Sequence, residues 1–238
     1  MIYVVSDLHG YPLERFKKLL ALANFGKDDF LFILGDVIDR NGDGGVRMLI
    51  WLMMQDNAQL ILGNHEIMLL SCDFLFDEIT NETVNTLDPE KIDALRDYLI
   101  CGGDVTIKNL QKLPKSTRRD ILDYLMDCPL YETVSAGKRD FLLVHAGLKD
   151  FDPNKKMSDY SAHDLIWTRP GFNDFYFDDI ITVFGHTPTV FYGGKYLGKT
   201  IRTRTWINID VGAGGGEEPV LLRLDDLKEF QLEKNCDE

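Results

Sequence analysis

Short apolar runs that end abruptly in polar residues recur along this chain of 238 residues. Five such runs begin at Ile2, Phe30, Leu60, Phe141 and Ile180, and each passes directly into a segment rich in Asp, Asn, His and Gly. Apolar runs of this length, bounded by glycine and polar residues, are typical of buried β-strands. The sequence therefore predicts five buried strands, each followed at once by a polar loop.

Amphipathic helical patterns separate the first three of these strands. Apolar residues recur at the i, i+3, i+4, i+7 spacing within residues 13–23 and within residues 46–53. Strands that alternate with helices favour parallel pairing through right-handed crossovers. Further strand-like segments follow at residues 205–211, 219–224 and 230–232. We therefore expect an α/β fold in which two mixed β-sheets pack as a sandwich flanked by helices.

The middle of the chain, at about residues 67–130, carries helical patterns almost throughout. Pro89 stands where one of these helices would begin, and Gly102 and Gly103 stand where it would end. No apolar run in this segment passes into a cluster of metal-binding residue types. We expect a single domain over residues 1–238 with a mainly helical cap at about residues 67–130.

Charge and composition narrow the class of protein. The chain has 26 Lys and Arg against 39 Asp and Glu, a formal net charge of −13, which argues against nucleic acid or an anionic membrane as a partner. The longest purely apolar stretch, residues 48–54, is far shorter than the roughly 20 residues that span a bilayer. The cysteines have no C-x-x-C pair and are expected to be reduced; they are Cys72, Cys101, Cys128 and Cys236. We expect a soluble, cytoplasmic protein, with the oligomeric state left open.

Residues 193–200 match the G-x-x-x-x-G-K-[ST] pattern of a nucleotide-binding P-loop. A P-loop needs a helix directly after it, because the helix N-terminus and the backbone amides hold the phosphates. The residues that follow, 201–207, are rich in β-branched side chains and look like a strand. We therefore expect a hairpin loop here and no P-loop.

The candidate chemistry lies at the ends of the predicted strands, where α/β proteins bind their ligands. Four of the five histidines stand in these positions. Carboxylate, imidazole and amide-oxygen ligands together suit manganese, iron or zinc. Six ligands are too many for one catalytic ion but suit two ions that share a carboxylate, an arrangement that favours hydrolysis at phosphorus. The six residues are Asp7, His9, Asp36, Asn64, His145 and His186.

These segments resemble the motifs of the calcineurin-like metallophosphoesterases. The resemblance is strongest to the serine/threonine phosphoprotein phosphatase branch, especially its bacterial and phage type, typified by the bacteriophage lambda protein phosphatase. It runs from Asp7 to about Asp210 and rests on five motifs in order: Asp7-Leu8-His9-Gly10, Gly35-Asp36-Val37-Ile38-Asp39-Arg40, Gly63-Asn64-His65-Glu66, His145-Ala146-Gly147 and Gly185-His186-Thr187-Pro188.

The resemblance implies a role for each matched residue. Asp7, His9 and Asp36 would hold the first metal ion, and Asp36, Asn64, His145 and His186 would hold the second. The two divalent ions, manganese first with iron or zinc as alternatives, would activate a hydroxide for direct in-line attack on phosphorus. His65, oriented by Asp39, would protonate the leaving oxygen. Arg40 and Arg169 would bind the phosphate oxygens, and Asp210 would stand behind the metal ligands or in a plain turn.

Three functions remain open at this point. The first is a phosphatase acting on phosphoserine or phosphothreonine in a phosphoprotein or phosphopeptide, and the second is a symmetric bis(5'-nucleosyl)-tetraphosphatase. Asp39 and Glu66 favour the first, because bacterial tetraphosphatases usually resemble Gly-Asp-x-x-Ala-Arg and Gly-Asn-His-Asp at these motifs. The third is a non-catalytic scaffold, which the intact set of ligands argues against. Small phosphate esters and dinucleoside polyphosphates therefore stay open as substrates.

Overall fold

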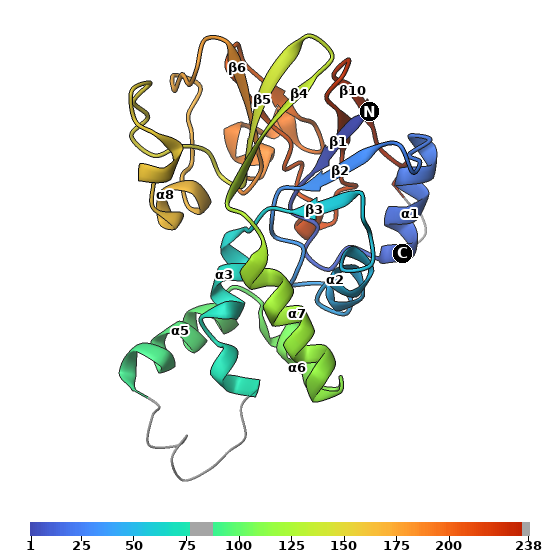
Figure 1. The fold of residues 1–238 in the computed structure, drawn as a ribbon, viewed down its shortest axis with the longest axis vertical. Helices are drawn as coiled ribbons and strands as arrows, with labels where there is room; N and C mark the ends of the chain where they lie inside the picture. Colours follow the sequence, from blue (N-terminus) through green and yellow to red (C-terminus); the bar gives the residue numbers. More distant parts are fainter. Residues whose placement is uncertain (77–87, 235–238) are drawn as a thin grey trace.

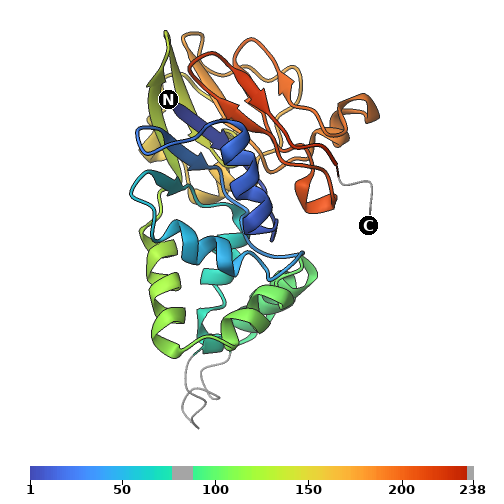
Figure 2. The same ribbon diagram turned by 90° about the vertical axis from the view of Figure 1, so that its right-hand side faces the viewer.

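The protein is built around two five-stranded β-sheets, seen in a computed structural model that describes residues 1–76 and 88–234 (Figures 1 and 2). The first sheet has the order β10-β9-β1-β2-β3. Its strands are β1 (Ile2–Val5), β2 (Phe30–Ile33), β3 (Ala58–Leu60), β9 (Leu221–Arg223) and β10 (Lys228–Phe230). The second sheet has the order β4-β5-β6-β8-β7. Its strands are β4 (Tyr131–Ala136), β5 (Arg139–Val144), β6 (Ile180–Phe184), β7 (Ile201–Arg202) and β8 (Trp206–Asn208).

Both sheets are mixed, as the sequence predicts. Strands β1, β2 and β3 are parallel, as are β5, β6 and β8, whereas the pairs β1–β9, β9–β10, β4–β5 and β7–β8 are antiparallel. The carboxyl ends of the parallel strands therefore share one edge within each sheet. The predicted α/β fold class with two mixed sheets and flanking helices is confirmed.

The two sheets pack face to face through alternate side chains of their strands. Val4 and Phe32 of the first sheet lie in one buried cluster with Phe141 and Val183 of the second. Tyr3, the neighbour of Val4, points to the opposite face and packs among the helices, because successive strand residues face opposite sides. This alternation produces the sandwich core.

Helices cover the outer faces of both sheets. Helices α1 (Leu13–Leu22) and α2 (Val46–Leu52) bury apolar faces at Phe16 and Leu49 against the first sheet, in agreement with the predicted periodicity. Helix α8 (Ala162–Ile166) packs at Leu165 in the cluster on the outer face of the second sheet. The carboxyl ends of the parallel strands therefore face the remaining helices, which belong to the predicted cap.

The cap extends from that edge of the sandwich, as both ribbon views show (Figures 1 and 2). It begins within α3 (Asn64–Leu70) and continues through η1 (Asp73–Phe76), α5 (Pro89–Ile100), α6 (Asp104–Gln111) and α7 (Lys115–Asp127). Helix α5 starts at Pro89 as predicted, and Asp88 accepts a hydrogen bond from the Lys91 backbone. Residues 77–87 of the predicted cap lie outside the described residues. The described cap helices share the buried cluster of α1 and α2, so the cap is packed onto the core.

The structure also shows the P-loop-like segment and three of the four cysteines. A strand, β7, follows the P-loop-like residues 193–200, so the helix that a P-loop requires is not there. Cys72, Cys101 and Cys128 are unpaired thiols, whereas Cys236 lies outside the described residues. Within residues 1–76 and 88–234, no helix is long and apolar enough to cross a bilayer.

Candidate metal centre

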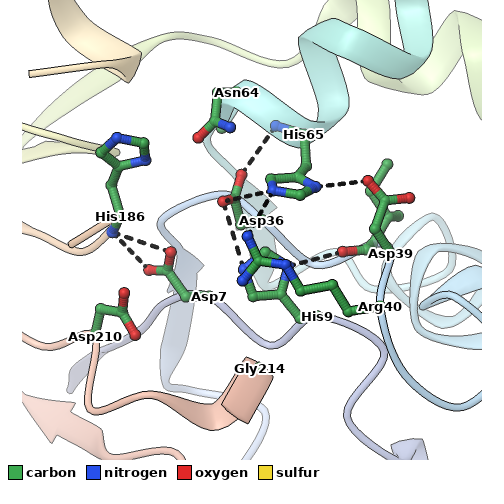
Figure 3. Close-up of polar contacts among 12 residues, drawn as sticks. Asp7, His9, Asp36, Asp39, Arg40, Asn64, His65, His186, Asp210 and Gly214 are labelled. Atoms are coloured by element: carbon green, nitrogen blue, oxygen red, sulfur yellow. Dashed lines mark hydrogen bonds and ion pairs between the residues drawn. The ribbon is translucent and has the colours of Figure 1, made fainter. Parts of the chain in front are cut away.

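Strand ends from both sheets meet at one buried cluster of polar side chains. The first sheet supplies Asp7 and His9 after β1, Asp36 after β2, and Asn64 and His65 at the start of α3. The second sheet supplies His145 after β5 and His186 after β6. All seven side chains are buried, with exposed fractions between 0% and 7%. The strand-end residues of the two sheets therefore meet at one place, with Asp36 in the middle of the labelled side chains (Figure 3).

Unusual backbone geometry aims these side chains at the centre. Asp7, His9, Asp36 and His186 have φ values of 52°, 41°, 53° and 65°, which non-glycine residues seldom adopt. A side chain at Gly35 would lie 2.6 Å from both the Gly63 backbone and His145 Nδ1. Left-handed backbone at several residues of one buried cluster is typical of functional sites, where the surrounding fold holds the strain.

His145 points its Nε2 into the centre. Its Nδ1 lies 2.7 Å from the Leu34 carbonyl oxygen and donates to it, which fixes the orientation of the ring. The Nε2 lies 2.9 Å from Asn64 Oδ1, 3.2 Å from His186 Nδ1 and 3.5 Å from Asp36 Oδ1. Imidazole nitrogens and amide and carboxylate oxygens are ligands that divalent metal ions such as manganese, iron and zinc bind, so this group of atoms fits a metal ion.

His9 repeats this arrangement on the other side of Asp36. Its Nδ1 lies 3.0 Å from the Ile38 carbonyl oxygen, and its Nε2 lies 3.6 Å from Asp36 Oδ2. The ligand atoms of His9, Asp36 and His65 lie within 4.8 Å of one another, and so do those of Asp36, His145 and His186. In addition, the buried Nε2 of His186 has no hydrogen-bond partner among the described residues. These residues therefore fit two divalent ions, with Asp36 placed to bridge them.

The protonation states of the cluster suit metal ligands. Burial lowers the pKa of His9 to about 3 and that of His186 to about 2, so both imidazoles are neutral near pH 7. Burial alone would raise the pKa of Asp36, but the neighbouring His145 and His65 lower it below the ordinary value. Metal ions bind neutral imidazole and ionised carboxylate.

Asp7 and Asp210 form a second buried pair of acidic residues beside His186. Both oxygens of Asp7 accept a hydrogen bond from the His186 backbone, at 3.0 and 2.9 Å, and Asp7 belongs to neither of the two compact ligand groups. Burial and the neighbouring carboxylates, Asp210 first, raise the pKa of Asp7 well above its ordinary value. Asp210 accepts from the Gly212 backbone at 3.0 Å, and burial raises its pKa as well. Two adjacent buried carboxylates are stabilised by nearby positive charge, so this pair also fits a centre that holds cations.

The predicted acid and its partner are in direct contact. His65 Nδ1 lies 2.6 Å from Asp39 Oδ2, and both side chains are buried. Burial alone would lower the pKa of His65, but the charge of Asp36 and the hydrogen bond with Asp39 raise it. Arg40 Nη2 lies 3.0 Å from His65 Nε2, and since arginine can only donate, Nε2 accepts here and Nδ1 donates to Asp39.

The two predicted phosphate-binding arginines lie at different places around the cluster. Arg40 follows Asp39 and contacts His65 directly. Arg169 Nη1 lies 3.3 Å from Thr187 Oγ1, next to the predicted ligand His186. The positive charges of both arginines oppose the rise that burial causes in the pKa of Asp210.

The sequence analysis gives no structural or chemical role at this site to three further residues. Glu66 accepts backbone hydrogen bonds from Asp36 and Val37 at 2.8 Å and from Gly63 at 3.0 Å, and so joins the loops after β2 and β3. Tyr98 and Thr106 of the cap both donate to Asp39. Glu66 lies within a recognised motif, but the two cap residues lie at ordinary helix positions, and no local pattern marks them.

Comparison with known proteins agrees with this geometry. The sequence model of the family described as calcineurin-like phosphoesterase matches residues 1–210. The chain is 28% identical over 148 residues to a symmetrical bis(5'-nucleosyl)-tetraphosphatase of Acidovorax sp. (strain JS42), covering 62% of this chain and 44% of that relative. The alignment thus spans less than half the length of this curated relative.

Two solved structures share the fold. A candidate diadenosine tetraphosphatase matches with a TM-score of 0.60 and 18% identity, over 97% of this chain and 92% of that one. A serine/threonine phosphatase from Saccharomyces cerevisiae matches with a TM-score of 0.56 and 14% identity, over 99% and 81%. At such identities these matches support the architecture and leave the substrate open.

Proposed function

The chain belongs to the calcineurin-like phosphoesterase family, and on that premise we propose that it hydrolyses dinucleoside polyphosphates. Its class as a metal-dependent phosphatase follows from the family. The substrate is the proposed part, and the observation that carries it is the similarity to a curated symmetrical tetraphosphatase. The function placed first in the sequence analysis, a serine/threonine protein phosphatase, becomes the second candidate.

Two hollows, one lined by a predicted ligand and the other by a residue bonded to one, support a substrate with two nucleosides. One, of about 320 Å³, is lined by Asn64, residues of α3 and α5, and the exposed ring of Trp167. The other, of about 570 Å³, is lined by Tyr11, Arg15 and Asn41 among others. Asn41 Nδ2 donates to the His9 carbonyl oxygen at 3.1 Å, which places this second hollow next to a predicted ligand. A molecule with a nucleoside at each end of a phosphate chain suits hollows at both places.

The residues of the centre would divide the chemistry among them. The predicted ligands would hold two divalent ions, which polarise a phosphoryl group and activate water for in-line attack on phosphorus. Asp39 holds the Nδ1 side of His65, so Nε2 faces the centre. Once Arg40 has turned to the substrate, Nε2 can take up a proton, which the raised pKa of His65 favours, and deliver it to the leaving oxygen. The planar guanidinium of Arg40 matches two phosphoryl oxygens.

A specific feature of the motifs favours the second candidate, the protein phosphatase. Asp39 stands where bacterial tetraphosphatases usually carry alanine, and it is paired with His65 at 2.6 Å. A proton donor held in this way suits a poor leaving group such as the serine or threonine oxygen. The two candidates share the metal centre and differ in what the surrounding surface binds.

A direct competition distinguishes the two candidates. Metal-stripped protein is reloaded with Mn²⁺ and given diadenosine tetraphosphate and a phosphoserine peptide in parallel, with ADP and inorganic phosphate as the measured products. The Asp36→Asn variant is the control, and we expect it to be inactive on both substrates. We expect a higher kcat/KM for the dinucleotide, with ADP as the product. A higher value for the peptide would replace the proposal with the protein phosphatase, and no turnover with Mn²⁺, Fe²⁺ or Zn²⁺ would overturn both.

A further inference from the structure

Two described side chains of the cap reach the metal centre at the carboxylate of Asp39. Asp39 uses Oδ2 to bind His65 Nδ1 at 2.6 Å. Its other oxygen, Oδ1, lies 2.8 Å from the Tyr98 hydroxyl of α5 and 2.5 Å from Thr106 Oγ1 of α6. Asp39, Tyr98 and Thr106 are all fully buried. Both oxygens of Asp39 therefore have partners, one in the centre and one in the cap.

We propose that Tyr98 and Thr106 are positioning residues for the proton-donating histidine. They hold the carboxylate of Asp39 in one orientation, and Asp39 in turn holds the imidazole of His65. This inference rests on the proposed role of His65 as the general acid. It assigns a function to the cap: the cap aligns the proton donor of the reaction.

The directions of the hydrogen bonds support this role. A carboxylate can only accept, so both hydroxyls donate to Asp39 Oδ1. Thr106 Oγ1 also accepts from the Asp39 backbone N–H at 3.0 Å, so Thr106 holds both the main chain and the side chain of this residue. To turn away from His65, the carboxylate would have to break both hydroxyl bonds in a buried site, where water cannot replace them.

The cap also supports the backbone of the same loop. Asp39 and Arg40 are consecutive residues with φ values of 76° and 66°, and such conformations persist when surrounding contacts hold them. The Gly102 carbonyl oxygen, between α5 and α6, accepts from the Arg40 backbone at 3.1 Å. The cap thus holds both the partner of the acid and the main chain of a proposed phosphate-binding residue.

The close approach of the cap depends on a small residue in the loop below it. A Cβ atom at Gly44 would lie 2.5 Å from Thr106 Oγ1 and 2.7 Å from the Thr106 backbone. Gly44 has a φ of 68°, so glycine is needed for its conformation as well as for the contact. Helix α6 therefore rests directly on the loop that carries Asp39.

A comparison of leaving groups tests the proposal. A general acid matters for phenyl phosphate, whose leaving phenolate is basic, and matters little for 4-nitrophenyl phosphate, whose leaving group needs no proton. We expect Tyr98→Phe and Thr106→Val each to lower kcat for phenyl phosphate about tenfold and to leave kcat for 4-nitrophenyl phosphate and both KM values nearly unchanged. Thr106→Ser keeps the hydroxyl and should restore the rate.

Tyr124→Phe is the matched control, since Tyr124 lies in cap helix α7 and its hydroxyl has no bond to Asp39. We expect this variant to behave as the wild type on both esters. Equal losses on both esters in the Tyr98 and Thr106 variants, or no loss on either, would overturn the positioning role. If the wild-type protein hydrolyses neither ester nor diadenosine tetraphosphate, the phosphatase function itself fails, and the inference fails with it.

A spectroscopic measurement tests the same contact without turnover. The Nδ1 proton of His65, held 2.6 Å from Asp39 Oδ2, should give a far-downfield ¹H NMR signal that is lost in His65→Asn. We expect this signal to move upfield or broaden in Thr106→Val, even if Tyr98→Phe does not fold, and to be unchanged in Tyr124→Phe. An unchanged signal in Thr106→Val would contradict the proposal.

Discussion

The metal centre and the cap bring side chains to the same place by different routes. The predicted metal ligands follow directly after strands, on loops whose backbone is left-handed at Asp7, Asp36 and His186. Tyr98 and Thr106 instead belong to helices, and only their hydroxyl groups reach the centre. We expect the strand-end loops to determine where the chemistry takes place and the cap to determine how well one proton transfer is aligned. Loss of a strand-end residue should therefore be far more severe than loss of a cap hydroxyl.

The largest effect is expected at the residue that the two ligand groups share. Asp36→Ala removes the carboxylate from both groups, so the protein should lose bound metal and about 10³- to 10⁴-fold in kcat. Metal content after dialysis and steady-state rates measure the two effects. Asp123→Ala, which changes an exposed carboxylate of α7, is the control. Full metal content and near-normal turnover in Asp36→Ala would remove Asp36 from the centre.

His65→Ala distinguishes two possible roles of His65, that of the general acid and that of a metal ligand. The sequence predicts that His65 is the general acid, yet its ring also lies in one compact group with His9 and Asp36. We expect metal content to stay nearly unchanged while turnover of phenyl phosphate falls roughly 10²- to 10⁴-fold. If one equivalent of metal is lost instead, His65 belongs to the ligand set and the acid must be another group.

A charge-conserving substitution tests the phosphate-binding arginine. Arg40→Lys keeps the positive charge and removes the planar fork, so kcat/KM should fall about 10²-fold. Arg169 bonds to Thr187. We therefore expect Arg169→Lys to lower kcat/KM less than Arg40→Lys does. Equal effects of the two substitutions would show that the contact of Arg40 with His65 carries no special weight.

The smallest expected effect is on the pH dependence of the unfolding free energy. It distinguishes His9, a predicted ligand that titrates in acid, from Tyr98, a cap residue that does not. Burial lowers the pKa of His9 from 6.5 to about 3, so acid protonates His9 first in the unfolded chain. Its contribution to stability is complete above about pH 6.5 and is lost as the pH falls toward about 3. Metal-stripped wild type should lose up to about 1.4 kcal/mol of unfolding free energy per pH unit relative to His9→Gln.

Urea unfolding at several pH values measures this difference, and the cap again provides the comparison. Burial and the charge of Asp39 raise the pKa of Tyr98 above its ordinary value, so its hydroxyl keeps its proton throughout the acidic range. The difference between wild type and Tyr98→Phe should therefore not change with pH between 4 and 7. If the difference in unfolding free energy from the wild type changes with pH by the same amount for Tyr98→Phe as for His9→Gln, that result would contradict the assignment of the pH dependence to the titration of His9.

The same contrast explains how much the sequence could reveal. Strands β1 and β6 have the bounds of their apolar runs, because the last three residues of each run are buried and the run ends at a polar loop. Strand β4 went unrecognised because most of its side chains are only half-buried or exposed, so it lacks a continuous apolar run. Strand β3 spans Ala58–Leu60, so it begins two residues before the predicted run at Leu60, and the Ile61 backbone still donates to the Ile33 carbonyl oxygen at 2.8 Å.

For the site, local motifs identify the strand-end residues but not their partners. Tyr98 and Thr106 are separated from Asp39 by 59 and 67 positions in the sequence, and each lies where a helix would place an ordinary core residue. The substrate is similarly hidden. Asp39 and Glu66 favoured a protein phosphatase, yet Glu66 binds backbone amides of the centre.

Anomalous diffraction from crystals grown with Mn²⁺ is the most direct test that this cluster binds two metal ions. We expect two manganese peaks roughly 3.5–4 Å apart, with Asp36 between them, His9 beside one peak, and His145 and His186 beside the other. A single peak, or peaks remote from Asp36, would contradict the assignment of this cluster as a two-metal phosphohydrolase centre.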